Sequence, residues 1–360
     1  MDSNWLPDWS GVRLATETLR ELELVEDVIT LIAGFCKQPA VLLFGGYVAR
    51  GVHGVAYPDD RHRQCTTLFC PTECSLDKFA LLDPHDWSLG QRENHVEGAS
   101  VAYIGGLVYN FTGNALNAFN PWTRAIDPPI IMGGTCDYRC VNGPVAVDKS
   151  LYVFCHFTDF TSDRIPCGST RAMEYHTTTK TWTRKAAVPG NKGRYRNACA
   201  VVVGASIFVL WDRDPSIPGT HNDLEQYYTP ADKWYQCEAN PNRRYHCAFA
   251  ADTHENGVLY ACGGSDFKSA SLGYATSGCE RYRIEIGQWE VIANLLTPRC
   301  SATAVFVEGS LFVLGGVTNQ SHRGVHVSSD CERWKDDERQ WVRVPGHMPR
   351  GVAGAAAVVI

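Results

Sequence analysis

The sequence predicts an all-β fold, a six-bladed β-propeller closed into a ring. Three observations lead to this prediction. A unit of about fifty residues recurs along the chain, as it does in some propeller blades. Each unit ends near a tryptophan, and the two ends of the chain carry complementary halves of one unit.

The repeat is clearest at its start, where an arginine leads into a short strand of small and apolar residues. A turn and a second apolar strand follow in every unit except the last, where the sequence ends. Five arginines open such segments, at steps of 57, 48, 55 and 51 residues: Arg139, Arg196, Arg244, Arg299 and Arg350. The spacing predicts one blade for each arginine.

The end of the repeat is marked by a tryptophan that follows a strand and a short turn. Six tryptophans take this place: Trp87, Trp122, Trp182, Trp234, Trp289 and Trp341. The last two are preceded by Glu280-Arg281-Tyr282 and Glu332-Arg333-Trp334, which shows the likeness of the units best. Six tryptophans predict six blades, of which the second is compact.

The two chain ends complement each other. Residues 355–360 form a first strand that no second strand follows, and residues 40–46 form a second strand that no first strand precedes. Pairing them completes one blade and covers both sheet edges. We therefore expect the N- and C-terminal strands to close the ring within one blade.

Double glycines stand at the end of the second strand in three units, at Gly45-Gly46, Gly263-Gly264 and Gly315-Gly316. Glycine permits close backbone approach there. Three further units carry Phe111-Thr112, Cys155-His156 and Trp211-Asp212 instead. With the period and the tryptophans, these pairs make residues 39–360 resemble the Kelch-repeat family, here without the BTB and BACK domains that many Kelch adaptors carry.

Residues 1–38 form a separate N-terminal segment in this interpretation, with a helix expected over residues 13–36 from its apolar stripe. Residues 24–35 resemble the opening helix of an F-box, which would recruit a ubiquitin-ligase core. The alternative is a helix that packs on the propeller as a cap.

Charge and composition narrow the expected partners and compartment. The formal net charge is −6, which disfavours general binding of nucleic acid or of membrane surfaces. We recognise no signal peptide and no apolar run of membrane-spanning length. With 15 cysteines and no export signal, we expect reduced thiols in the cytoplasm, with the nucleus as an alternative.

Candidate chemistry is sparse in the sequence. His62, Cys65, Cys70 and Cys74 lie within 13 residues, but their spacing matches no standard zinc finger. Several other cysteines recur at equivalent repeat positions, which is typical of core packing. No phosphate-binding loop, nucleophile elbow or zinc-protease motif is found. We therefore expect no metal, no cofactor and no enzymatic activity.

The resemblance places the first strand of each blade innermost and the loop before it at one mouth of the channel. It implies that arginines ring this mouth and bind an acidic peptide, because guanidinium groups bind carboxylates in a bidentate manner. The alternative is that they serve bonding between blades. The candidate partner-binding residues are Arg139, Arg194, Arg196, Arg243, Arg244, Arg299 and Arg350.

The function expected from these observations is a protein-binding scaffold, with a ubiquitin-ligase adaptor as one form of it. Two alternatives belong to other classes. One is a propeller enzyme that acts on a small molecule or sugar, in the manner of galactose-oxidase relatives. The other is a purely structural scaffold in a larger assembly.

Overall fold

The computed structural model describes residues 41–47, 66–69, 80–82, 101–112, 115–120, 127–133, 138–160, 166–189, 195–213, 223–242, 244–253, 257–266, 274–321, 324–345, 348 and 351–359. This part of the chain is almost wholly β-structure, with one single-turn 3₁₀ helix, η4 (Thr229–Ala231). None of its helices is long and apolar enough to cross a lipid bilayer. The predicted N-terminal helical segment, residues 1–38, lies outside the described residues.

The described residues form six four-stranded antiparallel sheets, which we number as blades from the one shared by the chain ends. Blade 1 contains β29 (Ala353–Val359), β1 (Val41–Tyr47), β2 (Thr66–Phe69) and β3 (Ala80–Leu82). Blade 2 contains β4 (Val101–Ile104), β5 (Leu107–Thr112), β6 (Ala115–Phe119) and β7 (Ile130–Ile131). Blade 3 contains β8 (Tyr138–Val147), β9 (Ser150–Phe160), β10 (Pro166–His176) and β11 (Thr181–Ala187).

Blades 4 to 6 follow the same order from the inner to the outer strand. Blade 4 contains β12 (Tyr195–Val203), β13 (Ser206–Arg213), β14 (Asp223–Tyr228) and β15 (Lys233–Gln236). Blade 5 contains β16 (Ala248–Asp252), β17 (Val258–Cys262), β20 (Cys279–Arg283) and β21 (Gln288–Ile292). Blade 6 contains β23 (Thr303–Val307), β24 (Ser310–Leu314), β27 (Cys331–Lys335) and β28 (Gln340–Arg343).

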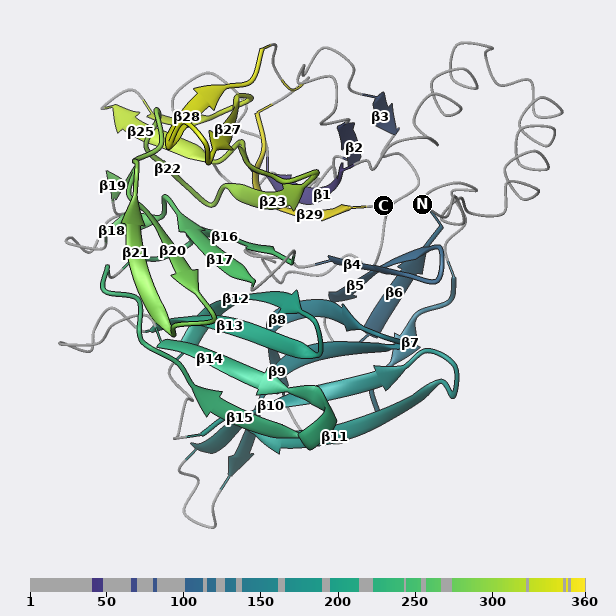
Figure 1. Cartoon of the computed structure of the whole chain (residues 1–360). Helices are drawn as coiled ribbons and strands as arrows, with labels where there is room; N and C mark the ends of the chain where they lie inside the picture. The colour runs from purple at the N-terminus through teal and green to yellow at the C-terminus, as the bar shows by residue number, and fades with distance from the viewer. Residues whose placement is uncertain are drawn as a thin grey trace, which may run out of the picture.

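The innermost strands form a closed cycle of neighbours (Figure 1). Strand β4 contacts β8, β8 contacts β12, β12 contacts β16, β16 contacts β23, β23 contacts β29, and β29 contacts β4. A ring of this kind leaves no inner sheet edge exposed to another chain. The predicted all-β propeller class is confirmed.

Blade 1 joins the two ends of the described chain. Strand β29 pairs antiparallel with β1 from Val41 opposite Val359 to Tyr47 opposite Ala353. The prediction that the C-terminal strand supplies the inner strand missing from the N-terminal unit is confirmed. Neighbouring blades enclose β29 because it contacts both β23 and β4.

Aromatic pairs explain why a tryptophan recurs at the end of each unit. In blades 3 to 6 the tryptophan lies opposite an aromatic residue of the third strand, with ring centroids 4.9 to 5.5 Å apart. The pairs are Tyr175–Trp182, Tyr227–Trp234, Tyr282–Trp289 and Trp334–Trp341.

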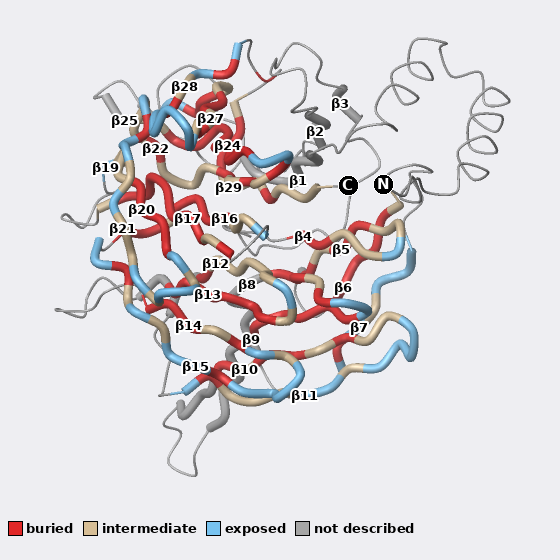
Figure 2. The backbone as a smooth tube through the Cα atoms, viewed as in Figure 1, coloured by how far each residue is buried: buried red, intermediate tan, exposed pale blue. Residues whose placement is uncertain are grey.

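Three of these indoles also tie each blade to the one before it. The Nε1 atoms of Trp234, Trp289 and Trp341 donate to backbone carbonyls of the preceding blade at 3.2, 2.9 and 2.9 Å. The acceptors are Ala186, Glu238 and Ala293. These three tryptophans therefore contribute to the blade interfaces, while exposed residues gather on the outer hairpins (Figure 2). Trp87 and Trp122 lie outside the described residues.

The glycine pairs lie where neighbouring blades approach most closely. Gly263 and Gly315 adopt φ values of +64° and +63°, in the left-handed region that favours glycine. A Cβ atom on Gly263 would overlap the carbonyl oxygen of Arg299, and one on Gly315 would overlap that of Val352. Both oxygens belong to segments that enter the next blade, so the pairs bring successive blades together.

Two small sheets follow these glycine pairs and stand apart from the blades. The first pairs β18 (Ser265–Asp266) with β19 (Tyr274–Ala275). The second pairs β25 (Val317–Ser321) with both β22 (Arg299–Cys300) and β26 (Gly324–Val327). In blade 3, which has Cys155-His156 at this position, β9 instead runs on without a break.

Candidate functional site

Arg299 lies in β22, just before the inner strand of blade 6, and its side chain is fully buried. Its Nη2 atom is 2.6 Å from Oε1 of Glu332, and its Nη1 atom donates to the carbonyl of Gly315 at 2.6 Å. Glu332 also accepts backbone N–H groups of Leu296 and Thr297, at 2.7 and 3.1 Å. The ion pair thus links blade 6 to the segment that enters it from blade 5.

Arg244 repeats this arrangement in blade 5. Its Nη2 atom bonds both carboxylate oxygens of Glu280, and its Nη1 atom donates to the carbonyls of Gly263 and Gly278 at 3.0 and 2.5 Å. The expectation that Arg244 and Arg299 face an acidic partner is therefore corrected. Each guanidinium is buried and engaged with a glutamate of the unit that it opens, a structural role within the blade rather than between blades.

A third buried glutamate shows what happens where the glycine pair is replaced. Glu225 occupies in blade 4 the position of Glu280 and Glu332, two residues before the buried aromatic of the third strand. Its carboxylate accepts the indole N–H of Trp211 at 3.1 Å. Trp211 occupies in blade 4 the place of Gly263 and Gly315. Its indole N–H therefore supplies a hydrogen-bond donor to the buried carboxylate of Glu225.

The position of Arg350 in the repeat also differs from the prediction. Gly264 donates its N–H to the carbonyl of Arg299 at 2.8 Å, and Gly316 donates in the same way to Val352 at 2.7 Å. Val352 is therefore the equivalent of Arg299 in blade 1, and Arg350 stands two residues before the equivalent position.

The remaining arginines are not tested by side-chain geometry. Arg139 and Arg196 lie in β8 and β12, whose backbones are described. Arg194, Arg243 and Arg350 lie outside the described residues, and a partner-binding role of these five arginines stays a prediction.

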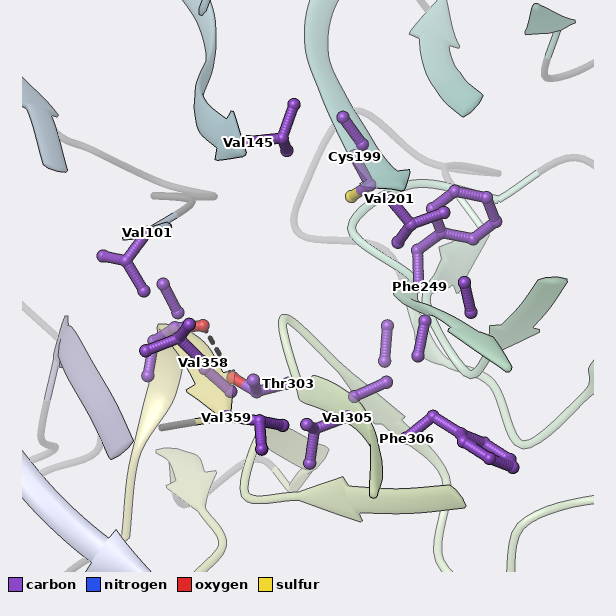
Figure 3. Close-up of a pocket in the computed structure, with 18 of the residues that line it drawn as sticks. Val101, Val145, Cys199, Val201, Phe249, Thr303, Val305, Phe306, Val358 and Val359 are labelled. Atoms are coloured by element: carbon purple, nitrogen blue, oxygen red, sulfur yellow. Dashed lines mark hydrogen bonds between the residues drawn. The ribbon is translucent and has the colours of Figure 1, made fainter. Parts of the chain in front are cut away.

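A central cavity of about 500 Å³ lies between the inner strands of all six blades. Small apolar side chains make most of its wall, and Figure 3 shows lining residues such as Val101, Val145 and Cys199 around the open space. Thr303 also lines it, but its hydroxyl donates to the carbonyl of Ala355 at 2.6 Å. The middle of the channel therefore offers little polar chemistry.

One end of this cavity carries polar residues in an unusual conformation. Seven non-glycine residues of the described chain have positive φ, and five of them lie in turns between strands. The other two are His246, at +52°, and Ser301, at +51°, and both line the cavity. Left-handed backbone at such residues costs about 1–3 kcal/mol and tends to be kept at functional sites.

Hydrogen bonds connect these residues around the cavity. Ser301 donates its N–H to the carbonyl of His246 at 2.8 Å, and Gly354 donates to the carbonyl of Ser301 at 2.7 Å. Gly354 has a φ of +65° and lines the cavity as well. We call His246, Ser301 and Gly354, from blades 5, 6 and 1, the channel mouth.

Sequence reasoning missed the channel mouth. Its members stand two residues after Arg244, Arg299 and Val352, yet they are a histidine, a serine and a glycine. The shared feature is backbone conformation rather than side-chain type. Aligning Val352 with Arg244 and Arg299 places His246, Ser301 and Gly354 at one equivalent position of the repeat, and this is the sequence signal for the channel mouth.

The described cysteines belong to the interior rather than to a reactive site. The eight cysteines whose side chains are described are free thiols, five of them buried, and burial raises the pKa of Cys262 and of Cys331. Among the described residues no three His, Cys, Asp or Glu side chains form a metal-binding group. The sequence cluster of His62, Cys65, Cys70 and Cys74 lies outside them.

Comparison with known families agrees with this architecture. Residues 298–346, which include all four strands of blade 6, match the Kelch motif. Together with the closed ring of four-stranded sheets, this match supports a β-propeller of the Kelch-repeat type.

Some known proteins that resemble part of this chain are named as enzymes. N-acetylneuraminate epimerases of Escherichia coli strain K12 and of Shigella flexneri serotype 5b are each 28% identical over 102 residues, which is 27% of this chain. The match spans 28% of the length of those relatives. A solved structure titled "Structure of YjhT" covers 72% of this chain and 86% of its own, with a TM-score of 0.53 and 15% identity. That likeness shows the fold.

The expectation that the chain has no enzymatic activity is overturned by these relatives, since they are named as enzymes. Residues from loops of several blades, rather than one contiguous motif, make the mouth of a propeller.

Proposed function

We propose that the chain is a propeller enzyme that acts on a small acidic sugar at the channel mouth. The observation that carries the proposal is the pair of left-handed polar residues, His246 and Ser301, that line the central cavity. The names of the relatives supply the substrate class, a sugar acid, and the reaction class, inversion of a stereocentre.

The chemistry of the channel mouth suits such a reaction. Inversion of a stereocentre breaks a bond and re-forms it on the opposite face, with a proton removed and a proton delivered. Imidazole can take both roles, and His246 is partly exposed at the cavity rim. The Ser301 hydroxyl can donate to or accept from a substrate oxygen beside it.

The cavity size is consistent with one small ligand. Pockets for small molecules have volumes of about 300–1,000 Å³ and combine apolar walls with a few polar groups. This cavity has about 500 Å³, small apolar walls and polar groups at one end. The carboxylate of an acidic sugar would remain at the mouth, because the middle of the channel is apolar.

Incubation with a freshly dissolved single stereoisomer of N-acetylneuraminate tests the proposal. We expect proton NMR to show interconversion of its stereoisomers at least about a hundredfold faster than in buffer, as general acid–base catalysis alone supplies. A neutral N-acetylated hexose should react much more slowly, and heat-unfolded protein should be inactive. Equal rates with and without the folded protein for every sugar would overturn the proposal.

Binding of an acidic peptide has less support as a second function. It was inferred from the arginines, and the two whose side chains are described are buried in ion pairs. Recruitment of a ligase core through residues 1–38 remains a separate proposal, which affinity purification with and without that segment would test.

A further inference from the structure

We propose that the two small sheets beside the channel mouth form a sugar-binding flap in which Tyr274 and His326 contact the ligand directly. The inference rests on the proposed function for the class of ligand. In this proposal the flap holds the sugar ring, and the channel mouth carries out the reaction.

The position of the flap follows from its hydrogen bonds. Ser265 of β18 exchanges both backbone hydrogen bonds with Tyr245, at 3.0 and 2.8 Å, and Tyr245 directly precedes His246. In the second sheet, Val317 of β25 pairs with Cys300, which directly precedes Ser301. Each small sheet is thus anchored one residue from a member of the channel mouth.

The two small sheets also lie against each other. Strand β19 contacts β25, and the labels of β18, β19, β22 and β25 stand together at the upper left of Figure 1. They come from adjacent blades, which the glycine pairs hold close. The flap therefore lies next to the segments that carry His246 and Ser301.

Tyr274 gives this surface an aromatic face. At 68% exposure it is the most exposed large hydrophobic side chain among the described residues, although it lies in strand β19. Covering this ring with a ligand would be favourable, because it removes apolar surface from water. Aromatic side chains combine an apolar face with a polar tip, and this combination suits a sugar ring with its own apolar face and hydroxyl edge.

His326 gives the surface an oriented polar group. Its Nδ1 atom lies 2.9 Å from the hydroxyl of Thr318, its cross-strand partner in β25. A hydrogen bond to one ring nitrogen fixes the ring and assigns the other nitrogen to a further partner. His326 is exposed, so Nε2 can reach a hydroxyl or carboxylate of the ligand.

Single substitutions separate the two contacts. Tyr274→Ala should raise KM about three- to tenfold by removing one aromatic contact, and Tyr274→Phe should retain the wild-type value. His326→Ala should raise KM about tenfold through loss of one hydrogen bond. The turnover number should change little in each, because these contacts are made with substrate and transition state alike.

Two further variants serve as controls. Thr318→Val removes the hydroxyl that orients His326, and should raise KM by a smaller factor while moving the imidazole NMR signal of His326. Tyr235→Ala removes a tyrosine of 42% exposure on β15, outside the flap, and should leave KM unchanged.

Titration with N-acetylneuraminate, observed at the imidazole signal that His326→Ala removes, completes the test. A shift of this signal together with the KM changes supports the flap. Turnover with unchanged KM in both alanine variants and no shift overturns the flap and leaves the proposed function intact. A shift without turnover supports the flap and overturns the proposed function. Neither shift nor turnover overturns both.

Discussion

Arg299→Ala should lower the free energy of unfolding by about 3–5 kcal/mol, because it leaves the carboxylate of Glu332 buried without its charge partner. Both side chains of the pair are fully buried. The backbone N–H groups of Leu296 and Thr297 would still contact Glu332, but they carry no full charge. Urea unfolding followed by tryptophan fluorescence measures the loss.

Two variants make this result specific. Lys335→Ala breaks an exposed pair with Glu338 and should cost less than about 1 kcal/mol. The double change Arg299→Met with Glu332→Leu removes both charges and should recover most of the stability. A loss below about 1 kcal/mol in Arg299→Ala would contradict the buried ion pair, and would return Arg299 to the candidates for partner binding.

Deletion of residues 353–360 should abolish cooperative unfolding of the propeller. The deletion removes β29, which pairs with β1 and also contacts β23 and β4. It opens the ring and exposes strand edges on both sides. The expected loss exceeds the whole stability of a typical domain, about 5–15 kcal/mol. A sigmoidal thermal melt with the midpoint of the full chain would show that the ring closes in another way.

A matched glycine pair tests the same closure without a deletion. Gly315 and Gly309 have similar φ values, +63° and +69°, so alanine strains both backbones to a similar degree. Only at Gly315 would the new Cβ meet a carbonyl oxygen, that of Val352 as it enters blade 1; at Gly309 it meets open space. Gly315→Ala should therefore destabilise the protein by several kcal/mol more than Gly309→Ala. Equal losses would mean that blades 6 and 1 do not approach as described.

The repeat made the architecture predictable from sequence. Strand periodicity, the blade-end tryptophans and the complementary chain ends each reflect a packing or pairing need that recurs in every blade. Trp234 shows why: its ring packs on Tyr227 and its N–H bonds the preceding blade, so the position tolerates little change. The pairing of β29 with β1 follows from the same logic.

The candidate site was less predictable because it depends on distant residues. The role of Arg299 is set by Glu332, 33 residues later, and that of Arg244 by Glu280, 36 residues later. Both glutamates were visible in the sequence as part of the blade-end motif, and pairing one with each arginine would have predicted burial. The left-handed backbone of Ser301 has no comparable sequence signal, because serine rarely adopts this conformation and its presence does not indicate it.

The most direct test of the central claim is the rate of stereoisomer exchange of N-acetylneuraminate at equilibrium, measured by NMR for the wild-type protein and for His246→Gly. Glycine accepts the left-handed backbone of His246, so the variant should fold with an unchanged melting temperature. We predict that the wild-type protein accelerates the exchange and that His246→Gly loses at least about a hundredfold of this acceleration. A folded His246→Gly variant that exchanges the sugar at the wild-type rate would contradict the assignment of the channel mouth as the active site.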